Sequence, residues 1–259
     1  MKQTDWRNTV IVISMGMVIL IVSLLMTATG NDALLFGIMA VVTPLVALFL
    51  GVMGLQIYSR DSDSKDDRFN AFNYWFAIGL IMLSLAEIAG VLVSISLDPQ
   101  QMILIIALAQ LPGLLLWGIG IIQYLRSLNS ALGYVKPNNL WIGLFLATTL
   151  STITLVVIIV TQFPAIGLIE SIVLSPIVVG LALFVIITTA LVWIFRKGSL
   201  AQPLFLILLA LLLYLVRCSL WLFTDVGLTI PTDRVIAVEA FILCGTALLM
   251  ARNLGSIDT

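Results

Sequence analysis

The chain has 259 residues, of which 61% are apolar and 10% are charged, whereas soluble domains are roughly 45–50% apolar and about 25% charged. This composition excludes an ordinary soluble domain and indicates a polytopic membrane protein. The 12 Lys and Arg and the 13 Asp and Glu residues give a net charge of -1, and the basic residues are scattered, so we expect no nucleic-acid partner. The lack of histidine excludes histidine-ligated haem, His-based catalytic triads and the usual zinc sites.

Long apolar segments follow one another along the chain, separated by short polar breaks. A helix needs ~20 mostly apolar residues to cross a bilayer, and eight segments are suitable. The sequence therefore predicts an all-α integral membrane protein with about eight transmembrane helices. The predicted spans cover residues 9–28, 33–57, 71–97, 102–125, 140–161, 170–195, 202–223 and 235–251. No break between them is long enough to fold as a soluble domain.

The basic residues fall almost entirely on one side of this topology. With a cytoplasmic N-terminus, the outer side holds only Arg234, and Arg217 falls inside a span. The other basic residues are all on the inner side: Lys2, Arg7, Arg60, Lys65, Arg68, Arg126, Lys136, Arg196, Lys197 and Arg252. Cytoplasmic loops carry such an excess of Lys and Arg. We therefore expect both termini to be cytoplasmic, in the plasma membrane of a prokaryote.

The two halves of the chain resemble each other at a spacing of about 130 residues. Thr43–Leu45 in the second span is matched by Ser175–Ile177 in the sixth, and Gly113 in the fourth is matched by Gly245 in the eighth. Their common order predicts a 4+4 tandem repeat, with four-helix halves at 1–130 and 131–259. Because each half has an even number of spans, the halves should run parallel and be related by an axis along the membrane normal.

Only three Asp, Glu, Lys or Arg residues lie in the interior of the predicted spans, away from the first and last residue of each, namely Glu87, Arg217 and Glu239. A charge in the bilayer core costs roughly 2.5–3.5 kcal/mol on insertion scales, so such groups usually face the bundle interior and pair. Glu87 and Arg217 occupy matching positions in the two halves, and we predict that they face each other. Their predicted neighbours in a buried polar cluster are Glu239, Gln110, Ser84 and Tyr214.

This cluster has more than one interpretation. The first is a structural ion pair that fixes how the two halves dock. The second is a site that handles a ligand or a proton, and the third is a contact for a lipid headgroup or a partner. Cys218 and Cys244 also fall within spans, where thiols act as small apolar residues. We predict no metal site and no cofactor.

The lack of familiar catalytic motifs in the sequence favours a protein without enzymatic activity. The chain has no P-loop, no GxSxG elbow and no HExxH, and no lysine lies within a span to form a retinal Schiff base. The pattern of apolar helices and short loops is similar to that of the membrane sensor regions preceding prokaryotic histidine kinases, although no specific motif carries the similarity. We expect a non-enzymatic membrane-embedded subunit or sensor-like module.

The alternative hypothesis is a small secondary transporter with its site at the repeat interface, in the outer half of the bilayer. A polar cavity would favour this hypothesis, whereas an interface filled by side chains would favour the first one. The expected partners are the lipid bilayer and either another membrane protein or a second copy of the chain.

Overall fold

The computed structural model describes residues 3–60, 68–94, 99–132, 149–162, 167–223 and 226–255. Every regular element in these ranges is an α-helix. Seven of the helices are long and apolar enough to cross a membrane, so the chain has the architecture of a multi-pass α-helical membrane protein. They are α1 (Gln3–Ala28), α2 (Asp32–Arg60), α3 (Arg68–Val93), α4 (Pro99–Leu132), α6 (Leu168–Ile194), α7 (Ala201–Phe223) and α8 (Val226–Gly255).

The fifth predicted span differs from the others. Of the predicted range 140–161, residues 140–148 lie outside the described residues. The part that follows is a shorter apolar helix, Thr149–Gln162. Seven of the eight predicted spans are therefore confirmed as membrane-spanning in length and apolarity, and the fifth is confirmed only as helical over this shorter range.

Local sequence signals explain two helix boundaries. Gly30 has a φ of 71°, a left-handed conformation that glycine adopts without strain. Its amide donates to Thr27 O, and the Asn31 amide donates to Met26 O, which is the Schellman arrangement that ends many helices. Pro99 opens α4, a position where the missing amide hydrogen costs nothing.

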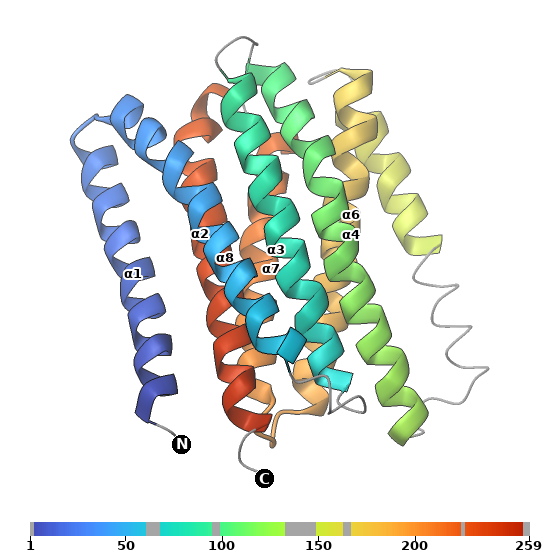
Figure 1. Cartoon of the computed structure of the whole chain (residues 1–259). Coiled ribbons are helices and arrows are strands. Elements are labelled where there is room, and N and C mark those ends of the chain that lie inside the picture. The colour runs from blue at the N-terminus through green and yellow to red at the C-terminus, as the bar shows by residue number, and fades with distance from the viewer. Residues whose placement is uncertain are drawn as a thin grey trace.

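Six helices form a closed ring around the core of the bundle. In spatial order they are α2, α3, α4, α6, α7 and α8, and α8 packs back on α2. Helix α1 lies outside this ring, where it packs mainly on α8 and more sparsely on α2. Figure 1 shows both chain ends at the same end of the bundle, opposite the α1–α2 turn.

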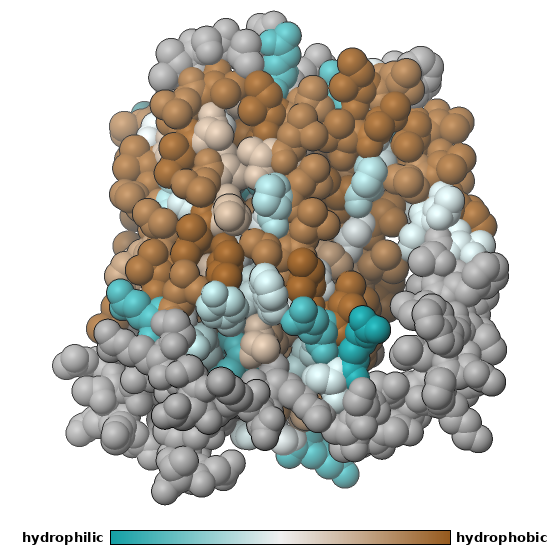
Figure 2. Space-filling model, turned by 45° about the vertical axis from the view of Figure 1, so that its right-hand side comes forward, coloured by the Kyte–Doolittle hydropathy of each residue, from teal (hydrophilic) through white to brown (hydrophobic). Residues whose placement is uncertain are grey.

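The outer surface is the one expected of a bundle surrounded by lipid. Apolar side chains cover the middle of the face seen in Figure 2, and hydrophilic side chains gather mainly toward the end that holds the termini. Helix α1 is the most exposed of the spans, with only 17% of its apolar window buried. In water such a surface would drive aggregation, whereas in a bilayer it costs nothing.

Glycines allow α3 and α4 to approach each other closely. A Cβ on Gly79 would lie 3.0 Å from the Gly113 carbonyl oxygen and would overlap the Trp117 indole, and a Cβ on Gly113 would lie 3.0 Å from the Gly79 carbonyl oxygen. Small residues at such crossings allow backbone contact between membrane helices.

The α2–α8 pair is held by a hydrogen bond, because the Tyr58 hydroxyl donates to Leu248 O at 2.6 Å.

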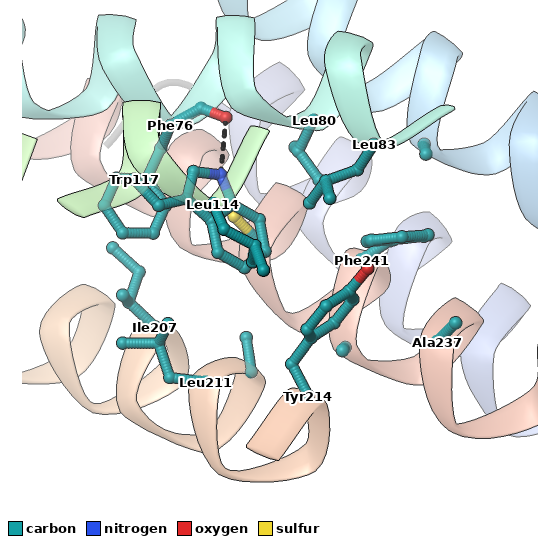
Figure 3. Close-up of a cluster of buried hydrophobic side chains, with 14 of the residues drawn as sticks. Phe76, Leu80, Leu83, Leu114, Trp117, Ile207, Leu211, Tyr214, Ala237 and Phe241 are labelled. Atoms are coloured by element: carbon teal, nitrogen blue, oxygen red, sulfur yellow. Dashed lines mark hydrogen bonds between the residues drawn. The ribbon is translucent and has the colours of Figure 1, made fainter. Parts of the chain in front are cut away.

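The interior of the ring is filled by large side chains, which Figure 3 shows between α3 and α4 on one side and α7 and α8 on the other. The Trp117 ring is stacked on Phe76 at 5.2 Å between centroids and meets Tyr214 edge-on at 5.8 Å. The Trp117 indole N–H donates to Phe76 O at 3.1 Å, so its one polar group is satisfied. This layer lies against the buried charges described next.

Candidate functional site: a buried ionic network

Arg217 on α7 is the centre of a network of charged side chains inside the bundle. Its Nη1 lies 2.6 Å from Glu87 Oε1 on α3. On α8, Asp233 accepts two parallel hydrogen bonds, from Arg217 Nε at 2.7 Å and from Nη2 at 2.9 Å. This bidentate geometry is the strongest form of Arg–carboxylate pairing. One guanidinium therefore ties α3, α7 and α8 together.

Depth along the helices explains why Glu87 and Arg217 meet. Glu87 lies six positions before Val93, the last residue of α3, and Arg217 lies six positions before Phe223, the last residue of α7. Both are therefore about 9 Å from the ends of their helices, at 1.5 Å per residue. Helices α3 and α7 both run toward the end of the bundle that holds the α1–α2 turn (Figure 1). The predicted contact between the two side chains is present in the structure.

Aromatic side chains enclose the Arg217 guanidinium. The Tyr214 hydroxyl accepts a hydrogen bond from Arg217 Nη1 at 3.1 Å, and the guanidinium lies over the Trp221 ring at 4.8 Å. Arg217 and Tyr214 are both 0% exposed. The ion pairs are thus shielded from solvent, which strengthens their attraction but makes an unpaired member costly.

Two of the other predicted cluster residues lie close to Glu87. Gln110 on α4 donates from Nε2 to Glu87 Oε1 at 3.1 Å. This orientation of the amide is required, because an ionised carboxylate can only accept hydrogen bonds. Ser84 lies one turn before Glu87, but its hydroxyl donates to Pro44 O on α2 at 2.7 Å. Gln110 therefore belongs to the ionic network, whereas Ser84 ties α2 to α3 beside it.

Glu239 is the predicted cluster residue that the structure places elsewhere. It lies on the side of α8 that faces α1, where a Cβ on Gly16 would be 3.3 Å from Glu239 Oε2. Its Oε1 is buried and has no hydrogen-bond partner among the described residues. Asp233 and Glu239 are six positions apart on α8, so their side chains point about 120° away from each other around the helix axis at 3.6 residues per turn. Two acids of one helix therefore face different neighbours.

Asp233 was missed because the last two predicted spans end at residue 223 and begin again at residue 235, which leaves Asp233 in the polar break between them. The helix instead begins at Val226, so Asp233 is inside it and is only 8% exposed. The position of Asp233 could have been predicted from its separation of 16 residues from Arg217, because the two residues lie on consecutive helices joined by a short connection. Such a connection brings the end of one helix beside the start of the next.

Arg234, which the sequence places in the outer loop, is also buried and is only 3% exposed. Its guanidinium lies 4.6 Å above the Phe36 ring of α2. The carbonyl of Arg234 accepts a weak hydrogen bond from Thr43 at 3.4 Å. Arg234 is within electrostatic range of Glu87, Asp233 and Arg217. If all four groups are ionised, their two positive and two negative charges cancel.

The network retains some unused hydrogen-bonding capacity. Glu87 Oε2 and Gln110 Oε1 are buried acceptors, and Arg234 Nη1 and Nη2 are buried donors, without a partner among the described residues. Chemically, the network can clamp helices, hold a water or a small polar group, or hold an anion at Arg234. It contains no nucleophile next to a base. Within the described ranges, no group of His, Cys, Asp or Glu gathers in a way that could hold a metal ion.

The fold and this network together define a multi-pass α-helical membrane protein whose spans are crosslinked by buried charges. Comparison of the chain with protein-family models, with curated proteins and with solved structures finds no match.

Proposed function

We propose that the chain is a non-enzymatic membrane-embedded subunit or sensor-like module. The observation that carries this proposal is the enclosure of Arg217, which is 0% exposed and engages carboxylates on two other helices. Protein groups engage four of the five N–H donors of this guanidinium, which leaves little hydrogen-bonding capacity for a substrate. Its physical effect is to fix the relative positions of α3, α7 and α8, as a scaffold or a signal-transmitting bundle requires.

We also propose the 4+4 parallel repeat, in which α1 to α4 correspond to the helix containing Thr149–Gln162 and to α6, α7 and α8. The ring of neighbours supports it. When each ring helix is exchanged for its counterpart, α2–α3 becomes α6–α7, α3–α4 becomes α7–α8, and α4–α6 becomes α8–α2. All six of these pairs pack together. The Glu87–Arg217 pair then joins equivalent helices of the halves 1–130 and 131–259.

The proposed location is the plasma membrane of a prokaryote with both termini in the cytoplasm. The asymmetric distribution of Lys and Arg supports this orientation, and the shared end of the two termini in Figure 1 agrees with it. A Ser62→Cys variant tests it with a membrane-impermeant thiol reagent. Ser62 lies outside the described residues, in the polar segment after α2.

We expect the Ser62→Cys variant to react only after the cells are opened. Background labelling should be low, because both native cysteines, Cys218 and Cys244, are buried. The unmodified chain is the control for this background. Labelling of intact cells at the rate seen in opened cells would place the segment outside and reverse the proposed topology.

The alternative function is a small secondary transporter. Two observations favour it, namely the unpartnered acceptors of Glu87 and Gln110 beside the ion pair and the unpartnered Glu239 Oε1. Buried polar groups without partners are uncommon in proteins as a whole. Polar and ionisable groups inside a membrane bundle, however, often mark a substrate or proton pathway. In this alternative the ion pair would have to open during the transport cycle.

Purification from the native membrane distinguishes the two functions. A tagged chain extracted in mild detergent should bring down a second membrane polypeptide, or a second copy of itself, in a fixed ratio. A chain that purifies as a monomer and, in liposomes, carries a solute in a way that Glu87→Gln abolishes would contradict the proposal and establish the alternative. The Gln substitution keeps the side-chain size, so that loss of transport reports on the charge.

A further inference from the structure

Arg234 is a buried cation whose hydrogen-bond donors are unused. The residue is 3% exposed, and neither Nη1 nor Nη2 has a partner among the described residues. Burying a charged donor without an acceptor is costly. An unsatisfied buried donor of this kind indicates a partner that is not part of the chain, such as a water, an ion or a ligand.

The protein holds this guanidinium in a defined orientation. Its face lies over the Phe36 ring, with Cζ 4.6 Å from the ring centroid. Stacking occupies the face of a guanidinium and leaves its in-plane N–H groups free to donate. The side chain is therefore fixed with its hydrogen-bonding edge unused, which is a preorganised binding arrangement.

The nearby acids are already engaged by Arg217. Both carboxylate oxygens of Asp233 accept hydrogen bonds from Arg217, and Glu87 Oε1 is shared by Arg217 and Gln110. Within the described ranges, Arg234 forms no ion pair of its own with either acid. Glu87 Oε2 also has no hydrogen-bond partner among the described residues, so in this arrangement neither acid supplies an acceptor to Arg234.

The position of Arg234 indicates where that acceptor comes from. Helix α8 begins at Val226, at the end of the bundle that holds the α1–α2 turn. Arg234 stacks on Phe36, which lies only four positions, or about 6 Å, inside the start of α2 at Asp32. The guanidinium is therefore near this end of the bundle, close to the depth where headgroup phosphates meet the apolar core of a bilayer. Helix α2, which carries Phe36, also begins at this end of the bundle (Figure 1). Guanidinium and phosphate match each other through paired N–H to oxygen hydrogen bonds.

We propose that Arg234, stacked on Phe36, binds a phosphate group at this end of the bundle. The phosphate belongs either to a phospholipid headgroup or to a free phosphate ion, and the two sources share the same chemistry at the guanidinium. The ion pairs of Arg217 are a separate element and remain as they are. This inference does not rest on the function proposed above.

Lipid binding to the detergent-purified chain tests the proposal. Phosphatidylglycerol, phosphatidylethanolamine and phosphatidylcholine should each raise the Tm by about 5 °C near saturation, and a phosphate-free galactosyl diacylglycerol should not. Inorganic phosphate is compared with chloride at equal ionic strength. A response to the phospholipids alone identifies the headgroup as the ligand, and a response to inorganic phosphate as well identifies a site that accepts the free ion.

Variants link this response to Arg234. We expect Arg234→Gln to weaken phospholipid binding by about tenfold or more, because a charge-assisted hydrogen-bonding group is lost. Arg234→Lys keeps the positive charge but loses the paired N–H donors of the guanidinium, so it should bind phospholipid with intermediate affinity. This variant replaces Arg234→Gln in the test if the Gln variant does not fold. The matched control is Arg196→Gln, which removes a guanidinium stacked on Trp193 at 4.3 Å in an exposed position.

Three results would overturn the proposal. The first is equal phospholipid affinity in the unmodified chain and in both Arg234 variants. The second is equal stabilisation by the galactolipid, which would show that the acyl chains alone bind. The third is an equal loss of affinity in Arg196→Gln, which would mean that any surface guanidinium attracts the lipid.

Discussion

The Arg217→Met variant is expected to lose more stability than any variant of its partners. Removing this guanidinium leaves both Glu87 and Asp233 buried without a counter-charge on α7. Breaking one buried pair costs roughly 3–5 kcal/mol, and here two carboxylates are stranded. Glu87→Gln should cost less, because Asp233 remains paired through both oxygens. Thermal unfolding in detergent measures the order of these losses.

Stability should return when the stranded acids are neutralised as well. We expect Arg217→Met combined with Glu87→Gln to recover part of the loss, and the triple variant that adds Asp233→Asn to recover more, since a neutral buried cluster carries no unpaired charge. Arg196→Met, which removes an exposed arginine, controls for the loss of a basic residue. Strictly additive losses across the series would show that the three side chains do not act as a network.

A Gly79→Ala substitution is expected to separate α3 from α4. The new methyl group would meet the Trp117 indole and, at 3.0 Å, the Gly113 carbonyl oxygen. The Trp117 indole is held by stacking on Phe76 and by its own hydrogen bond. Neither the indole nor the Gly113 carbonyl can therefore move aside without a loss of packing. Forcing extra atoms into a packed core costs roughly 1–3 kcal/mol, which a lower Tm in detergent would report.

Gly180→Ala is the matched control for this substitution. Gly180 lies inside α6, and a Cβ there would meet no atom within 4 Å. Because alanine is the better helix former by up to about 1 kcal/mol, the variant should be as stable as the unmodified chain or slightly more so. A similar decrease in Tm at Gly79 and Gly180 would indicate that glycine is needed for helix flexibility rather than for close packing.

Apolar length was a sufficient signal for most of the fold. Seven spans are recognisable because a bilayer selects helices by the length of their apolar segments, and tertiary packing adds little to that choice. The beginning of α8 was placed too late, because Pro231 and the charged pair Asp233 and Arg234 are typical of a loop. Inside a bundle, an acid that finds a partner, as Asp233 does in Arg217, is compatible with a helix.

The ionic network was only partly predictable for the same reason. Glu87 and Arg217 stand out as charges within apolar segments, and their matching positions predict the contact. Asp233 and Arg234 do not stand out, because an acid and a base next to each other in a polar break are ordinary. That Asp233 faces α7 while Glu239 faces α1 depends on the rotation of α8 about its axis, which the sequence pattern leaves open.

The packing of α1 and α2 against α8 sets an order on biogenesis. A ribosome delivers α1 and α2 to the membrane first, yet α8, on which both pack, is the last of these helices to be synthesised. Until then α1 has only α2, lipid or an insertion factor beside it, although α2 already packs on α3, and Arg217 of α7 lacks its bidentate partner Asp233 of α8. The ring can therefore close only once α8 has been inserted, and a chain interrupted before α8 would present an incomplete ring to the quality-control proteases of the membrane.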